Sequence, residues 1–111
     1  MIKIEVFYNL KDEIYKIIAQ GHAKFNEDGK DIVCASISVA LQQAIIGLLY
    51  ELKIKDDFYE MEKGNLLIDR TKIKDIKFNK EINLILNTMF LTIKTIQEEY
   101  PCYIKIVKSR I

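Results

Sequence analysis

The chain has 111 residues; half of them are hydrophobic, 30% are charged, and the formal net charge is +1. This is the length of one compact domain with its own hydrophobic core, so we expect a single domain over residues 1–111. The composition excludes a disordered chain, and the near balance of charge gives no case for nucleic acid or an anionic membrane as the main partner.

The first part of the chain predicts a β-hairpin. In residues 2–8 (IKIEVFY), apolar and charged residues alternate, as in a strand with one buried face. Residues 9–12 are polar and turn-like. Residues 13–23 predict a second strand, antiparallel to the first because the connection is so short. The segment KFNEDGK at residues 24–30 then predicts a polar loop.

Two helices and a second hairpin follow. Asp31 stands in an N-cap position before a helix that continues to Leu52. Residues 57–71 contain a Lys-Gly-Asn turn between two strand-like runs, and residues 80–100 predict a second helix that Pro101 ends. Residues 102–108 predict a last strand. The order ββαββαβ indicates one α+β domain with two helices packed against an antiparallel sheet.

The sequence also sets expectations about location and cofactors. Residues 1–10 lack the continuous apolar region of a signal peptide, and polar residues such as Gln42 and Gln43 interrupt the apolar stretch 32–52 too often for a membrane span. We expect a cytoplasmic protein with no membrane partner, in which Cys34 and Cys102 are reduced thiols, although a disulfide stays open. Two cysteines and one histidine make a poor zinc site, and no cofactor is expected.

His22 and Cys34 carry the chemistry that the sequence offers. Cys34 falls in the first turn of the predicted helix, where the helix dipole favours a thiolate, the nucleophilic form. The negative charge of Asp31, three residues earlier, works partly against this, so the sequence does not fix the direction of the net pKa shift. His22, the one histidine of the chain, ends the strand that leads into this helix and could exchange a proton with the thiol. Backbone N–H groups at the helix start, including that of Cys34, could form an oxyanion hole.

Each of these residues also has a purely structural interpretation. Cys34 could be a small core residue and His22 an ordinary hydrogen-bonded residue at a strand end. Asp31 could only cap the helix. Ser38 lies one turn after Cys34, where it could bond to a dyad member or to a helix carbonyl. Spacing alone leaves both interpretations open.

A family resemblance favours the catalytic interpretation. The segments GHA at residues 21–23 and DIVCASIS at residues 31–38, with the polar loop between them, resemble the paired motifs of Prp, a bacterial family of ribosomal-processing cysteine proteases. Length, element order and the MIKIEVF opening are similar as well. The resemblance implies a catalytic dyad of His22 and Cys34, with Gly21, Asp31 and Ser38 supporting the active site.

The resemblance implies more about partners. It implies removal of a short N-terminal extension from large-subunit ribosomal protein twenty-seven, in support of ribosome assembly. It also implies a homodimer and a flexible loop, Ala23–Lys30, that adjusts as the peptide enters. No metal and no direct nucleic-acid binding are expected.

Two other functions stay open at this stage. A non-catalytic ribosome-assembly or RNA-binding module would use the basic segments 71–80 and 105–110, provided that their lysines converge on one face. A redox protein would use Cys34 and Cys102, which lack the Cys-x-x-Cys spacing of a dithiol oxidoreductase.

Overall fold

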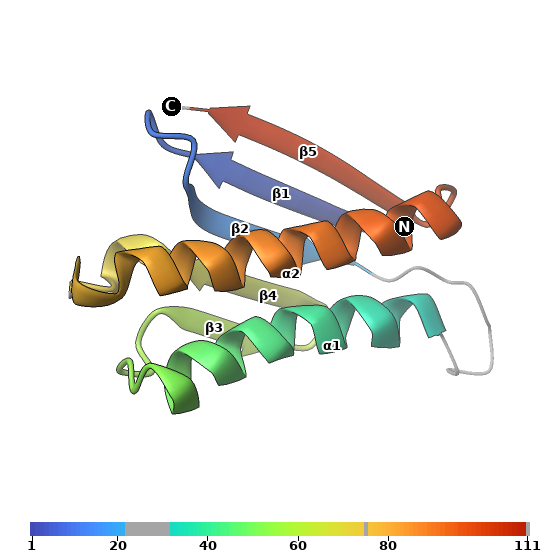
Figure 1. Ribbon diagram of the computed structural model, residues 1–111. Helices are drawn as coiled ribbons and strands as arrows, with labels where there is room; N and C mark the ends of the chain where they lie inside the picture. Colours follow the sequence, from blue (N-terminus) through green and yellow to red (C-terminus); the bar gives the residue numbers. More distant parts are fainter. Residues whose placement is uncertain (22–31, 75, 111) are drawn as a thin grey trace.

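The computed structural model describes residues 1–21, 32–74 and 76–110. Five strands form one sheet, and both long helices pack side by side on one face of it (Figure 1). The predicted α+β class and the order ββαββαβ are confirmed. In chain order the elements are β1 (Ile2–Tyr8), β2 (Ile14–Gln20), α1 (Ile32–Ile46), η1 (Gly47–Glu51), β3 (Tyr59–Glu62), β4 (Asn65–Asp69), η2 (Arg70–Lys72), η3 (Ile76–Phe78), α2 (Asn79–Glu99) and β5 (Ile104–Arg110).

The sheet is mixed, with the strand order β3-β4-β2-β1-β5. Three pairs are antiparallel, as predicted, but β5 lies parallel to β1, with Ile2 opposite Ile104. The expectation of a purely antiparallel sheet is corrected at this one pair. The parallel direction of β5 follows from its connection. The helix α2 lies between β4 and β5 in the chain, and such a helical crossover joins parallel strands.

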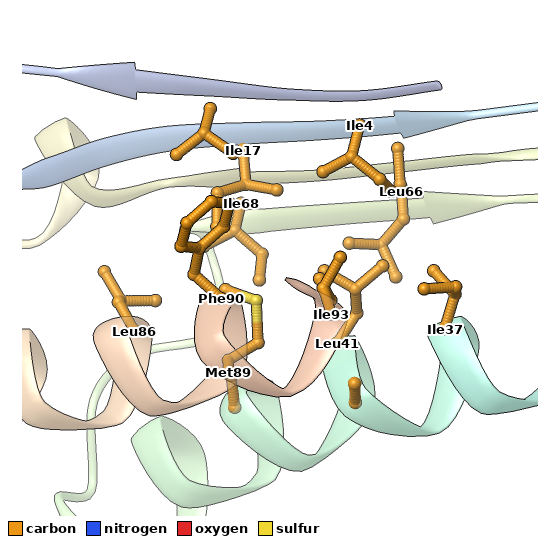
Figure 2. Close-up of a cluster of buried hydrophobic side chains, with 14 of the residues drawn as sticks. Ile4, Ile17, Ile37, Leu41, Leu66, Ile68, Leu86, Met89, Phe90 and Ile93 are labelled. Carbon is orange, nitrogen blue, oxygen red and sulfur yellow. The ribbon is translucent and has the colours of Figure 1, made fainter. Parts of the chain in front are cut away.

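The core lies between the sheet and the two helices, and Figure 2 shows side chains of both layers meeting there. The alternation in β1 produces this directly, because Ile2, Ile4 and Val6 are buried while Lys3 between them is exposed. The helices contribute one stripe each, at the spacing read from the sequence. The buried helical residues are Val33, Ile37, Ala40, Leu41, Ala44 and Ile45 in α1 and Ile82, Leu86, Met89, Phe90 and Ile93 in α2.

The first helix ends differently from the expectation. Its α-helical part stops at Ile46 and continues as the π-helical turn η1, where the N–H of Leu52 donates to the carbonyl of Gly47 at 3.2 Å. A Cβ atom on Gly47 would lie 3.4 Å from the side chain of Ile85 in α2. The glycine at the start of this turn therefore faces a side chain of α2.

By length and composition alone, residues Ile32–Glu51 are apolar enough to cross a membrane. We expected Gln42 and Gln43 to interrupt the stretch too often for a membrane span, and by length and composition this expectation is not met. In the structure the stretch is a core helix: Val33, Ile37 and Leu41 are buried against the sheet and α2. Burial inside the domain accounts for the apolar residues of this face, whereas Val39, Ile46 and Tyr50 are exposed.

A polar network joins the β1–β2 turn to the start of α2. The Glu13 carboxylate accepts hydrogen bonds from Asn9 at 3.0 Å, Asn83 at 2.8 Å and Asn79 at 3.3 Å. Arg70 in η2 donates to the side chains of both Asn79 and Asn83. The hydrogen bond from Asn9, followed by that from Asn83, lowers the pKa of Glu13 from 4.5 to about 2.

Glu13→Gln is expected to lower the free energy of unfolding at pH 7 by about 1 kcal/mol, because a charged acceptor of three hydrogen bonds is lost. A depressed folded-state pKa stabilises above the unfolded value and loses that effect as pH falls through the folded value. The difference between parent and variant should therefore shrink between pH 4.5 and about 2 in urea unfolding curves. Glu98→Gln, an exposed change on α2, is the control, and an equal loss in both variants would contradict the role of the network.

Candidate active site

A cavity of about 220 Å³ opens where the start of α1 meets the end of β2 and the β3–β4 hairpin. Three of the five residues singled out in the sequence line it: Gly21, Cys34 and Ser38. His22 and Asp31, with the expected loop Ala23–Lys30, lie outside the described residues. The other lining residues are Ile2, Ala19, Gln20, Ile37, Leu41, Met61, Glu62, Gly64, Asn65 and Leu66.

Cys34 is the third residue of α1 and is half-buried, packed against the core on one side and facing the cavity on the other. Its neighbour Val33 is fully buried, which fixes the rotation of the helix start. The first turn of α1 holds no acidic residue, and the thiol lies near the positive end of the helix dipole.

Ser38 lies one helical turn after Cys34 and is held by its own helix. The Nε2 of Gln42 donates to the Ser38 Oγ at 2.7 Å. Ser36, by contrast, donates to the carbonyl of Ile32 at 2.7 Å and does not line the cavity. The sequence did not single out Gln42, although its i+4 spacing from Ser38 was the signal that could have found it.

Gly21 has a conformation and a location that other residues cannot easily share. Its φ is 94°, and a Cβ atom would lie 2.6 Å from the carbonyl oxygen of Met1. Its N–H donates to the carbonyl of Gly64 in the β3–β4 turn at 3.0 Å. The chain therefore leaves β2 at a point fixed by β1 on one side and by the hairpin on the other.

Gly21→Ala is expected to lower the free energy of unfolding by about 1–3 kcal/mol, because the new methyl group meets backbone and the φ is strained. Peptide cleavage by the folded variant should also fall, since the cavity wall must shift. Thermal unfolding and initial cleavage rates measure the two effects. Gly47→Ala is the matched control, as its methyl group would meet only the side chain of Ile85, at 3.4 Å or more, and no φ strain arises there. If Gly21→Ala and Gly47→Ala lost equal stability and equal cleavage rate, the proposed role of Gly21 in the cavity wall would be wrong.

The β3–β4 hairpin supplies one wall that the sequence interpretation missed. Met61, Glu62 and Asn65 line the cavity, although the sequence pattern indicated only a structural hairpin there. Glu62 brings a carboxylate to a cavity that is otherwise mostly apolar. No local signal predicts this contact, because the hairpin and Cys34 are separated by more than twenty residues.

Cys102 is separate from this site. It is exposed in the turn before β5, does not line the cavity, and forms no disulfide with Cys34. This arrangement gives the redox interpretation no dithiol. Among the described residues, no three His, Cys, Asp or Glu side chains gather to hold a metal ion.

A thiol near the start of a helix, facing a cavity that can hold a side chain, is an arrangement found in enzymes that use a cysteine nucleophile. The family model described as cysteine protease Prp matches residues 1–105, and the chain belongs to this family of cysteine proteases. The non-catalytic assembly module is thereby set aside as the main function.

Two relatives and one solved structure agree with this. The chain is 37% identical to the ribosomal processing cysteine protease Prp of Staphylococcus aureus over 103 residues, which cover 90% of this chain and 92% of the relative. It is 32% identical to the protein of the same name from Mycoplasma genitalium over 106 residues, 96% and 94% of the two chains. It is also similar to the solved structure of the S. aureus protease with a covalently linked product peptide, with a TM-score of 0.85, 30% identity, and coverage of 98% and 100%.

Proposed function

We propose that this protease removes the short N-terminal extension of large-subunit ribosomal protein twenty-seven, using His22 and Cys34 as a catalytic dyad. The observation that carries the proposal is that Cys34 faces a cavity at the start of α1 together with Gly21 and Ser38. These three residues belong to the two segments that resemble the Prp motifs. The relatives are named ribosomal processing proteases, which supports a ribosomal protein as the substrate.

The proposed mechanism is acyl transfer through a thioester. The Cys34 thiolate attacks the scissile carbonyl, and the resulting oxyanion accepts hydrogen bonds from backbone N–H groups at the helix start. His22, protonated by the thiol, gives its proton to the departing amine as the C–N bond breaks. His22 then takes a proton from water, whose oxygen attacks the thioester and releases the acid and the thiol. Asp31 and Ser38 support the dyad in this proposal.

The cavity beside Cys34 suits one side chain of an extended peptide. Its volume of about 220 Å³ and its walls of Ile37, Leu41 and Met61 favour an apolar or aromatic group. Such a group next to the cut would place the scissile carbonyl at the thiol. The loop Ala23–Lys30 is proposed to adjust as this peptide enters, so that substrate binding completes the site.

We also propose a cytoplasmic homodimer. A groove of about 350 Å³ between α1 and α2 is lined by the exposed apolar residues Ile46 and Leu84, with Met89 at its base. Exposed apolar surface of this kind is typical of a contact between protein copies. The exposed thiol of Cys102 is consistent with a reducing compartment.

The test is cleavage of a synthetic peptide that spans the N-terminal extension of ribosomal protein twenty-seven from the same organism. Mass spectrometry of the products should show a single cut at the end of the extension. A peptide of the same composition in scrambled order is the control and should stay intact. If the folded protein cut neither peptide, or cut both at many bonds, the proposed substrate would be wrong.

A further inference from the structure

The strand β3 lies at one edge of the sheet, and its last two residues reach the candidate active site. In the order β3-β4-β2-β1-β5, β3 has a neighbour on one side only, and Figure 1 shows it at the opposite edge from β5. In the described part of the chain it pairs with β4 alone. Met61 and Glu62 of β3 line the same cavity as Cys34. An open strand edge therefore leads to the cavity that the thiol faces.

The register of β3 on β4 shows which backbone groups of β3 point away from the sheet. The N–H of Asp69 donates to the carbonyl of Phe58 at 2.7 Å, so these two residues form a hydrogen-bonded pair. Hydrogen-bonded and non-hydrogen-bonded pairs alternate along an antiparallel ladder. The next pair contains Tyr59 and the pair two residues further on contains Met61, so both pairs are non-hydrogen-bonded. The N–H and C=O groups of Tyr59 and Met61 therefore point outward from the edge.

The other side of β4 agrees with this alternation. The N–H of Gly21 donates to the carbonyl of Gly64 at 3.0 Å. Because the pairs alternate, Ala19 and Leu66 form the next hydrogen-bonded pair between β2 and β4. The backbone groups of Leu66 thus face β2 and not Met61. Elsewhere in the described chain, no backbone group bonds to Met61.

The side chains of β3 alternate between the two faces of the sheet. Tyr59 packs against the core, and Met61, on the same face, lines the cavity while 53% of its surface stays exposed. Glu60 between them is exposed on the opposite face. A chain added beside β3 would lie about 4.8 Å away, and its residue opposite Met61 would have its side chain on the face of Met61. That side chain would stand at the cavity.

We propose that the substrate of this protease binds as an additional strand on the open edge of β3, with its backbone hydrogen-bonded to Tyr59 and Met61. Main-chain hydrogen bonds would set the position of the peptide, and the cavity would select the side chain opposite Met61. This pairing would hold the scissile bond at Cys34. The inference rests on the proposed function, because the occupant is the N-terminal extension of ribosomal protein twenty-seven.

A second copy of this chain fits the edge of β3 poorly. Antiparallel pairing of two β3 strands would bring Glu60 and Glu62 of one copy beside the same glutamates of the other, and like charges directly opposite each other are destabilising. The strand also has only four residues, a length that suits a short peptide.

The other edge of the sheet is less suited to a peptide. The strand β5 carries Lys105 and Lys108, and lysines protect an edge strand from pairing. Of the two edge strands, only β3 contributes residues to the wall of the cavity. The substrate is therefore assigned to the edge of β3.

The experiment measures binding of a labelled peptide, by fluorescence anisotropy, to protein that carries Cys34→Ala and so cannot cleave it. The peptide spans the extension and the residues that follow the cut. In a series of such peptides, one backbone nitrogen at a time is methylated, which removes one N–H donor. Successive N–H groups of a strand point to opposite sides, so only alternate positions face β3. Methylation at these positions should raise Kd by at least about tenfold, and at the positions between them by no more than about threefold.

Met61→Pro tests the same pairing from the side of the protein. Proline removes the outward N–H and its ring hinders an incoming strand, but the hydrogen bonds to β4 remain, as at other prolines of edge strands. Met61→Ala is the matched control, because it also loses the side chain but keeps the N–H. In the Cys34→Ala protein, Met61→Pro should bind the unmethylated peptide at least about tenfold more weakly than Met61→Ala. Urea unfolding curves check both folds, and the methylated peptides decide the question if Met61→Pro unfolds.

Equal effects of methylation at all positions would overturn the inference, as would equal binding by folded Met61→Pro and Met61→Ala. If the parent cut the peptide at the end of the extension without an alternating pattern in binding, the pairing with β3 would be wrong and the proposed function would stand. An alternating pattern without this cut would overturn the proposed function alone. If the peptide were neither bound nor cut, both would be wrong.

Discussion

Replacing Cys34 by alanine is expected to reduce peptide cleavage by at least about a thousandfold, because the methyl group cannot attack a carbonyl. His22→Ala should reduce it by about 10²–10⁴-fold through loss of proton transfer. Cys34→Ala should not unfold the protein, since Cys34 is only half-buried and alanine is a good helix former. Initial rates from quantitative mass spectrometry give both numbers.

The matched control for Cys34→Ala is Cys102→Ala, which removes an exposed thiol that does not line the cavity. It should cleave at the parent's rate. The double variant lacking both His22 and Cys34 side chains should be no slower than Cys34→Ala alone, because the two groups act as a unit. Retained cleavage in Cys34→Ala, or equal losses in the two cysteine variants, would remove the proposed nucleophile.

The elements could be predicted because their signals are local. The alternation at Ile2, Ile4 and Val6 depends only on neighbouring residues, and Pro101 marks the end of α2 by its own chemistry. The direction of β5 could not be predicted in the same way, because the pairing of Ile104 with Ile2 joins the two ends of the chain. The π-helical turn that begins at Gly47, beside Ile85 of α2, is also not indicated by any local pattern.

The contrast between local signals and long-range contacts also applies to the candidate site. Gly21, Cys34 and Ser38 lie within eighteen residues of one another, so motif spacing brings them into view together. The wall made by Met61 and Glu62 comes from a hairpin later in the chain and requires the sheet register to place it.

Phe58 is the position where a single substitution should cost the most stability. Its side chain is fully buried, and its ring lies 5.0 Å from that of Tyr59, centroid to centroid. Its carbonyl accepts a hydrogen bond from the N–H of Asp69 at 2.7 Å, which aligns the start of β3 with the end of β4. The residue thus anchors the hairpin that carries Met61 and Glu62 to the cavity.

Phe58→Ala is expected to lower the free energy of unfolding by about 3–5 kcal/mol, from the lost burial and the cavity left behind. That is a large share of the roughly 5–15 kcal/mol typical of a domain, so the variant should unfold at much lower urea concentration. Phe58→Leu keeps most of the volume and should lose about 1.5 kcal/mol or less, while Leu10→Ala, at an exposed position, should change little. If Phe58→Ala and Leu10→Ala unfolded at the same urea concentration, Phe58 would not anchor the hairpin. Because the hairpin forms a wall of the cavity, Phe58→Ala should also lose its cleavage activity at a lower temperature than Phe58→Leu.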